Sequence, residues 1–234
     1  MRGVGWEPTW PEEGTWTRPS GSPAHCSRSR SGCHSRGRLL WFHPNVDPNH
    51  VYADLRDNVV AYQIVHAGTL VFIGLLGLAL YLLVRDLPGR AARVSRLAIG
   101  PFVLFYAAYE SVIGLAVGAL VQHGNDAPLR QRPAVADTIQ SLGNNVIVGD
   151  PGIVATVGSL AWIVAVLAAA VAYRHVGAPL LAAVLLGLSF VVVSHPPPIG
   201  PIGLVCFAGA VALLARGQRV SARLQAAAPT PIPS

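Results

Sequence analysis

The sequence predicts an all-α fold, a polytopic membrane helix bundle of five spanning helices with a disordered N-terminal tail and a short outer interfacial helix. Three observations predict it: five long apolar runs between residues 62 and 215, a charged content of only 12%, and arginines gathered at the ends of the runs. A hydrocarbon core of about 30 Å needs roughly 20 apolar residues at about 1.5 Å per residue. Because each backbone amide in lipid needs an internal partner, the runs must be helical. Buried helices of a soluble protein are the alternative, which five such runs in 234 residues disfavour.

The five runs differ in length. They are Tyr62–Val84, Leu97–Val121, Ile153–Tyr173, Ala178–Ser194 and Ile199–Ala215. The first three meet the length requirement for crossing a bilayer. The last two lie near its lower limit, so we expect them to stand almost upright or to use a locally thin membrane.

Two polar tails flank the expected bundle of residues 43–216. Residues 1–42 are expected to be a disordered N-terminal tail, or upstream sequence read from a misplaced start codon. Their first 38 residues are rich in Trp, Pro, Gly, Ser and Arg, and they have no apolar period with which to offset the entropy of ordering. They also lack the apolar stretch of about 7–15 residues that marks a signal peptide. Residues 217–234 are expected to form a second disordered tail.

The arginines predict the orientation. All 17 basic residues are arginine, and they alternate along the chain: the first and third loops and the C-terminus are positive, whereas the second loop is balanced and the fourth uncharged. Positive loops stay in the cytoplasm, so we expect a multi-pass protein of the cell membrane with a cytoplasmic C-terminus. Arginines at helix ends and in the tail favour the lipid bilayer as the partner and disfavour nucleic acid. Neither a helix–helix partner nor a homo-oligomer is specified.

The second loop contains a short helix signal of its own. Pro133 suits the first turn of a helix, Val135, Ile139 and Leu142 fall on one face, and Gly143 suits the end. We therefore expect a short interfacial helix on the outer surface.

The second run carries the chain's one deep acid. Glu110 lies near its middle, accompanied by Tyr106 and Tyr109. An intramembrane carboxyl is costly and is a candidate functional group by default. The alternative is a protonated carboxyl that hydrogen bonds to a neighbouring Ser, Thr or Tyr and serves helix packing alone.

Three histidines share the predicted outer side. They are His66 in the first run, His123 at the end of the second and His195 after the fourth. Imidazoles from several helices are raw material for a metal or haem site. The alternative is that each caps a helix or lies at the interface, and no cofactor is predicted.

Four strings carry a resemblance to known sequences. They are Tyr52-Ala-Asp-Leu, Phe105-Tyr-Ala-Ala-Tyr-Glu-Ser, Gly149-Asp-Pro-Gly and Ser194-His-Pro-Pro-Pro-Ile-Gly-Pro-Ile-Gly. Over residues 39–216 the chain resembles uncharacterised multi-pass membrane proteins of high-GC Gram-positive bacteria, which begin with one more spanning helix. The resemblance implies a membrane location and a helical fold, and it implies no activity.

Catalytic motifs do not stand out. The sequence holds no phosphate loop, HExxH, GxSxG or paired-carboxylate motif, so we do not expect an enzyme. The function we expect is a small membrane-embedded binding, sensing or scaffold protein. Two alternatives remain open: a haem- or metal-binding redox protein that uses the outer histidines, and a small proton-coupled transporter that uses Glu110.

Overall fold

The computed structural model describes residues 46–193 and 199–227, and within these ranges every regular element is a helix. The elements are α1 (Val51–Leu55), α2 (Val59–Val84), α3 (Gly89–Glu110), the π-helix η1 (Ser111–Ala116), α4 (Val117–Asp126), the 3-10 helix η2 (Leu129–Gln131), α5 (Arg132–Gly143), α6 (Ile153–His175), α7 (Leu180–Leu188), the 3-10 helix η3 (Ser189–Val193) and α8 (Ile199–Ala227). The predicted tail 1–42 lies outside the described residues. Helix α8 continues past residue 216 into the range expected to be tail.

Among the described residues, four helices are long and apolar enough to cross a membrane: α2, the continuous rod α3–η1–α4, α6, and α8 up to Gly217. The predicted all-α fold is therefore confirmed, and four of the five predicted spanning helices have the length and apolar composition needed to cross a membrane. The helical part of the fourth apolar run is shorter than the run predicted from the sequence. It forms nine residues of α7 and five of η3. At the rises of the two helix types these cover about 24 Å, less than the roughly 30 Å of a hydrocarbon core.

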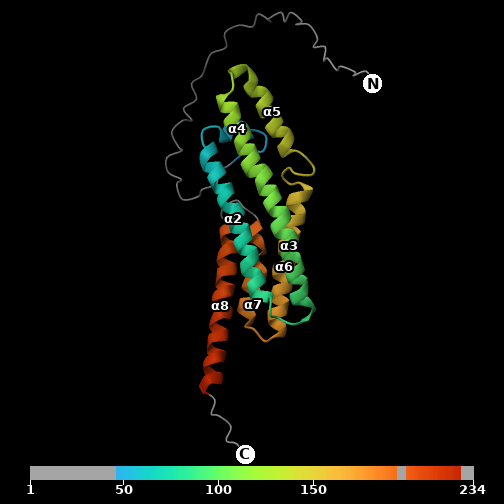
Figure 1. Cartoon of the computed structure of the whole chain (residues 1–234), viewed down its shortest axis with the longest axis vertical. Helices are drawn as coiled ribbons and strands as arrows, with labels where there is room; N and C mark the ends of the chain where they lie inside the picture. The colour runs from blue at the N-terminus through green and yellow to red at the C-terminus, as the bar shows by residue number, and fades with distance from the viewer. Residues whose placement is uncertain (1–45, 194–198, 228–234) are drawn as a thin grey trace, which may run out of the picture. The chain divides into compact units, whose positions relative to one another are not determined.

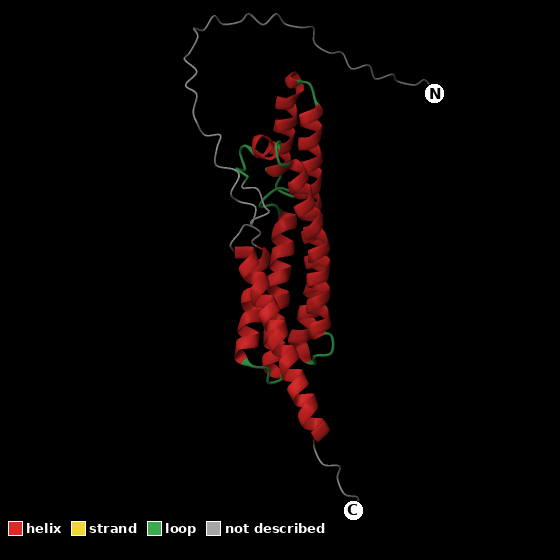
Figure 2. Ribbon diagram, turned by 90° about the vertical axis from the view of Figure 1, so that its left-hand side faces the viewer, coloured by secondary structure: helices red, strands yellow, loops and turns green. Residues whose placement is uncertain are grey.

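The helices run along one axis (Figure 1). We call the end where α2 stops and α3 begins the lower end, and the end where α4 stops the upper end. Helix α2 runs down, the rod α3–η1–α4 runs up, and α6 runs down along α3, its most extensive partner. Helix α7 then returns the chain upward, so that α8 runs down beside it (Figure 1). Figure 2, turned by 90°, shows the long helices again lying along the same axis.

Two apolar cores hold these helices together. The lower core joins α2, α3, α6, α7 and α8 around Trp162, which is completely buried. The Trp162 ring lies 4.7 Å from that of Phe102 and 5.9 Å from that of Phe207, centroid to centroid. The upper core joins α1, α2, α4 and α5 around Leu55, Val121 and Ile139.

Helix α5 forms where the second loop predicts a short helix, and it begins with a proline in its first turn. Its apolar face does not lie open for lipid. Ile139 is only 1% exposed, and Val135 and Leu142 pack around the same upper core.

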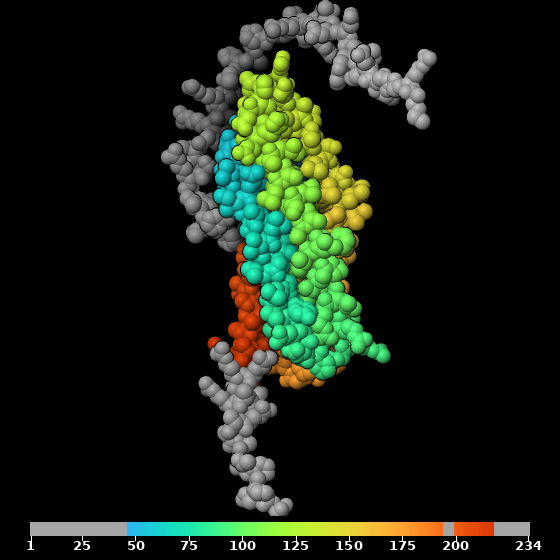
Figure 3. All heavy atoms as spheres, in the orientation of Figure 1, coloured from blue at the N-terminus to red at the C-terminus, as the bar shows by residue number. Residues whose placement is uncertain are grey.

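The rod α3–η1–α4 is longer than a membrane is thick. Its 38 residues span about 57 Å, against a hydrocarbon core of about 30 Å. The exposed large apolar side chains of the rod are Val94, Leu97 and Leu104, all in its lower half. On the face shown in Figure 3, the rod lies against α2. The lower half of the rod is therefore the part suited to lipid.

Charge differs between the two ends. At the lower end α2, α3, α6 and α8 and their connections hold Arg85, Arg90, Arg93, Arg96, Arg174 and Arg216, with Asp86 as the acid. At the upper end α1, α4, α5 and their adjoining segments hold Asp47, Asp54, Asp57, Asp126, Asp137 and Asp150, with Arg56, Arg130 and Arg132 as the bases. The described lower end is thus positive and the described upper end negative.

Candidate functional site

A cavity of about 680 Å³ lies where the upper and lower cores meet. Its wall is built by α2, the middle of the rod α3–η1–α4, α6, and the segment that joins α5 to α6. Most of the lining is apolar, and the polar side chains include His66, Glu110, Tyr62, Tyr106, Tyr109 and Asp150. The predicted intramembrane polar residues Glu110, Tyr106 and Tyr109 therefore face one shared space.

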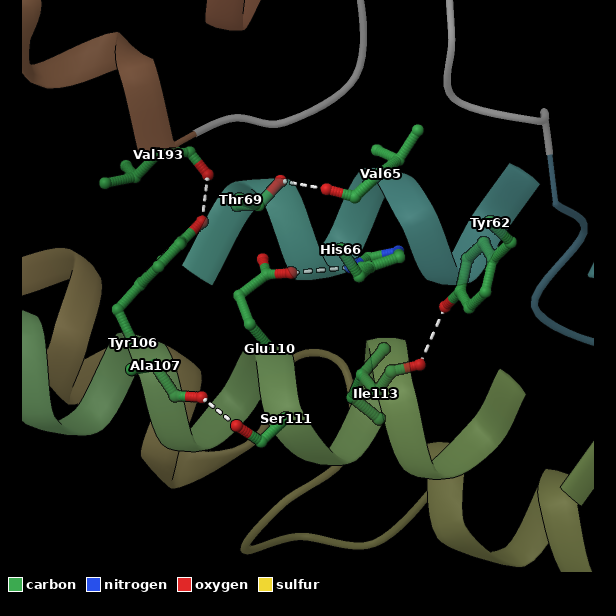
Figure 4. A network of polar contacts seen from close by, with 10 residues as sticks. All are labelled: Tyr62, Val65, His66, Thr69, Tyr106, Ala107, Glu110, Ser111, Ile113 and Val193. Atoms are coloured by element: carbon green, nitrogen blue, oxygen red, sulfur yellow. Dashed lines mark hydrogen bonds and ion pairs between the residues drawn. The ribbon is translucent and has the colours of Figure 1, made fainter. Parts of the chain in front are cut away.

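A buried pair of titratable groups forms the centre of the wall. Glu110 on α3 reaches across to His66 on α2, and its Oε2 lies 2.5 Å from the imidazole Nδ1 (Figure 4). His66 is 5% exposed and Glu110 is completely buried. At this distance the two groups share one proton, whichever of them carries it. The structure thus joins two residues that the sequence assigned to different candidate sites.

The close approach of α2 to the rod depends on Gly114, which has no side chain. A Cβ at Gly114 would lie 2.3 Å from Cγ of His66, so only glycine lets the imidazole sit at this level. Glu110 is the last residue of α3, and the π-helix η1 follows it directly. Such π-segments interrupt α-helices frequently at functional sites, because the extra residue per turn re-aims the neighbouring side chains.

Tyr62 holds the other side of the imidazole. Its ring centroid lies 4.2 Å from that of His66, and its hydroxyl donates a 2.7 Å hydrogen bond to the carbonyl oxygen of Ile113 in η1. Tyr62 is not among the site residues predicted from the sequence. The signal was present, since residues four apart lie on one face of a helix and Tyr62 precedes His66 by that interval.

Tyr106 forms the floor of the cavity. Its hydroxyl donates a 2.8 Å hydrogen bond to the Val193 carbonyl oxygen at the end of η3. Its backbone lies so close to α6 that a Cβ at Gly158 would meet the Tyr106 amide nitrogen at 2.9 Å. Below it lies a second cavity of about 220 Å³, lined almost wholly by apolar side chains, which also has Tyr106 and Val193 in its wall.

Asp150 completes the polar wall from the segment between α5 and α6. Its backbone amide donates a 2.9 Å hydrogen bond to the Gly143 carbonyl oxygen, and its carboxylate accepts a hydrogen bond from the Tyr109 hydroxyl. No sequence pattern marks Asp150 as a site residue. Only the fold brings it to Tyr109, because 40 residues separate the two along the chain.

The structure describes two of the three histidines of the predicted metal site. His66 is engaged with Glu110, and His195 lies outside the described residues. His123 is exposed on α4, nine residues beyond Gly114 and thus about 13 Å further along the rod. Within residues 46–193 and 199–227, no group of three or more His, Cys, Asp or Glu side chains could hold a metal ion.

The comparisons with known proteins add no identity. No protein-family model, curated protein or solved structure matches this chain. The resemblance to multi-pass membrane proteins of high-GC Gram-positive bacteria therefore stays a prediction, and the functional conclusions below depend on the geometry of the cavity.

Proposed function

We propose that this chain is an integral membrane protein that binds a small molecule in the cavity beside His66 and Glu110. The observation that carries the proposal is a buried, hydrogen-bonded histidine–carboxylate pair in the wall of a preformed cavity. Its volume of about 680 Å³ falls within the range of about 300–1,000 Å³ typical of ligand sites. Mostly apolar walls with a few convergent polar groups are typical of such sites, and ionisable groups in membrane helices mark ligand or ion pathways.

The proposed membrane position puts the cavity at the outer boundary of the bilayer. The lower half of the rod carries the exposed apolar side chains, and the lower end carries the arginines, which keep that end in the cytoplasm. Helix α7 must return the chain between α6 and α8, which run in the same direction, and we assign it the fifth pass. The upper end and α5 then lie outside, and the C-terminus lies in the cytoplasm.

Filling the cavity tests the binding function. The probe is 4-phenylbutanol, a neutral molecule with a ring and a short polar end, added to protein in lipid nanodiscs with empty nanodiscs as the blank. We expect the probe to raise the melting temperature of the wild type, because a ligand that binds only the folded state stabilises it. Ala155→Trp puts a large side chain into the cavity wall and should abolish the rise.

The matched control makes the same change at an exposed position of α8. Ala208→Trp should respond to the probe as the wild type does. A rise that is equal in all three proteins would show that the probe acts through the lipid. No rise in the wild type would count against a preformed ligand site.

Proton-coupled transport is the second candidate, and the completely buried Glu110 favours it. In this case Glu110 would exchange its proton when the ligand binds. Vesicles that contain the protein and a trapped pH-sensitive dye should then report proton movement when 4-phenylbutylamine is added outside. Glu110→Gln should abolish that movement, because an amide cannot titrate. Asp137→Asn, an exposed change outside the cavity wall, should leave it intact.

A further inference from the structure

The cavity wall also points to the chemical class of the ligand. We propose that the occupant is a small organic cation, an amine or quaternary ammonium group attached to an apolar body. This inference depends on the proposed binding function and deepens it. Three properties of the described wall support it: its charge, its aromatic rings and its apolar surface.

The charge of the wall excludes a net positive site. Glu110 and Asp150 are its acids, His66 is its base, and none of the described lining residues is an arginine. When His66 and Glu110 hold two protons between them, the pair is neutral and the Asp150 carboxylate gives the wall a net charge of −1. When they hold one proton, the pair carries −1 and the net charge of the wall is −2. A cation is therefore favoured over an anion in both states.

Three tyrosine rings supply the second property. Tyr62, Tyr106 and Tyr109 all line the cavity, and the rings of the last two lie 5.9 Å apart, centroid to centroid. The face of an aromatic ring attracts a cation within about 6 Å, which is how aromatic cages recognise quaternary ammonium groups. Tyrosines beside carboxylates thus provide two independent attractions for the same charged group.

The remaining wall suits the uncharged part of such a ligand. Val51, Ile113, Val117, Ile139 and Leu160 present hydrocarbon on several sides of the cavity. Apolar contact there stabilises a ring or a short chain by about 25 cal/mol for each Å² removed from water. The acidic upper end of the molecule adds long-range attraction, because clefts beside one sign of charge raise the local concentration of the opposite ion.

Three matched probes test the charge preference. They are 4-phenylbutylamine, 4-phenylbutanol and 4-phenylbutyrate, which share one skeleton and carry a cation, no charge and an anion at pH 7. Their dissociation constants would be measured by calorimetry on the full chain in lipid nanodiscs, with empty nanodiscs as the blank. We expect the amine to bind at least tenfold more tightly than the alcohol, and the carboxylate more weakly than the alcohol.

Asp150→Asn tests whether the preference for the amine arises in the cavity. It should weaken amine binding about tenfold and leave alcohol binding unchanged, and the unchanged alcohol value shows that the variant is folded. The control Asp137→Asn removes the same charge from α5, outside the cavity wall, and should leave the amine preference intact. Added salt provides a test without any variant, because screening should weaken binding of the amine and not that of the alcohol.

The outcomes separate this inference from the binding function on which it depends. Equal binding of all three probes, or a preference for the carboxylate, would overturn the cation assignment and leave the binding function standing. An amine preference that survives in Asp150→Asn and at high salt would also overturn it. Absence of binding by any probe would overturn the binding function, and the cation assignment with it.

Discussion

The contact between His66 and Glu110 brings together two ionisable side chains that are almost completely buried by the protein around them. Each alone would be a buried polar group with a large desolvation cost, and the hydrogen bond between them offsets part of it. The pair also links α2 to the rod. It therefore has a structural role that accompanies the proposed role in binding.

A double-mutant cycle should detect this link. We expect Glu110→Leu and His66→Leu to interact with a coupling free energy of about 1–2 kcal/mol, the range found for hydrogen bonds between model membrane helices. The measurement is the free energy of unfolding in a denaturing-detergent titration. Glu110→Gln should retain most of the stability, because its amide oxygen can still accept from the imidazole N–H.

The control cycle pairs His66→Leu with Ser111→Ala. The Ser111 hydroxyl is exposed and donates to the Ala107 carbonyl oxygen of its own helix, so its coupling to His66 should be near zero. If the Glu110 cycle is additive within about 0.3–0.5 kcal/mol, the spread expected of independent sites, the hydrogen bond does not hold the helices together.

Gly114 offers a second residue-level test. Gly114→Ala places a methyl group 2.3 Å from Cγ of His66, and overpacking of this kind costs about 1–3 kcal/mol. It should lower the unfolding free energy by that amount and weaken probe binding, since the imidazole must move. Gly74→Ala is the matched control on α2, where a Cβ meets no atom within 4 Å. Equal effects of the two changes would contradict the close approach.

Residue chemistry was only partly predictable. Glu110 was predicted as a candidate because a single acid in an apolar run is recognisable without knowing how the helices pack. Its contact with His66 was not predicted, because the contact joins residues 44 apart and depends on how α2 slides along the rod. Gly114 sets that offset, because a side chain at this position would clash with His66. The sequence does not show this role, since it does not show that His66 lies against Gly114.

At the scale of elements, the connection between α2 and α3 is held by one side chain. Arg96 on α3 reaches back to the end of α2, where its guanidinium donates to the carbonyl oxygens of Val84, Arg85 and Leu87 at 2.8, 3.2 and 3.1 Å. The last carbonyls of a helix have no partners within it, and a cation there also suits the helix dipole. The arginine that the sequence predicts as an orientation signal is thus also a helix cap.

Arg96→Ala should lower the unfolding free energy by about 1.5–3 kcal/mol, the order of hydrogen bonds that involve a charged group. Arg93→Ala removes the same charge from the same end at an exposed position and should cost much less. The detergent titration used for the residue-level variants measures both. If the two variants lose equal stability, the loss comes from charge and the cap contributes nothing.

The ends and the helix type of the fourth apolar run could not be predicted from its composition. Its composition matches that of the other runs, yet α7 and η3 cover only Leu180–Val193. Helix α7 begins after Pro179, and its last turn tightens into the 3-10 form at Ser189, whose hydroxyl donates to the Leu186 carbonyl oxygen and whose own carbonyl accepts from Trp162 Nε1. The Trp162 contact comes from the packing of α6 against this segment. The hydropathy of the sequence does not predict it.

For the whole molecule, the charge asymmetry predicts one orientation. A reporter fused after Arg216 should read cytoplasmic, one inserted beside Asp126 should read extracytoplasmic, and one inserted at Gly177 should read cytoplasmic. The reason is that arginine-rich ends remain in the cytoplasm while weakly charged or acidic connections are translocated. Compartment-specific reporter activity in intact cells makes the measurement.

The three reporters check each other. A reversed pattern at all of them would overturn the orientation, and with it the outer position of the cavity. A cytoplasmic reading at Gly177 with an extracytoplasmic reading after Arg216 would instead show that α7 does not cross, because α8 would then begin and end on opposite sides from those proposed.

The sequence by itself determined that the described segments are helical and that several of them are long and apolar enough to cross a membrane. Both follow from local properties: the length of an apolar run and the need of every buried amide for a partner hold whatever the neighbouring helices do. Tertiary structure alone decided that Glu110 meets His66, that Tyr62 and Asp150 join the same wall, and that the helix after α7 tightens into the 3-10 form of η3. These outcomes depend on the relative offset and rotation of packed helices, which small residues such as Gly114 and Gly158 set through contacts far apart in the chain.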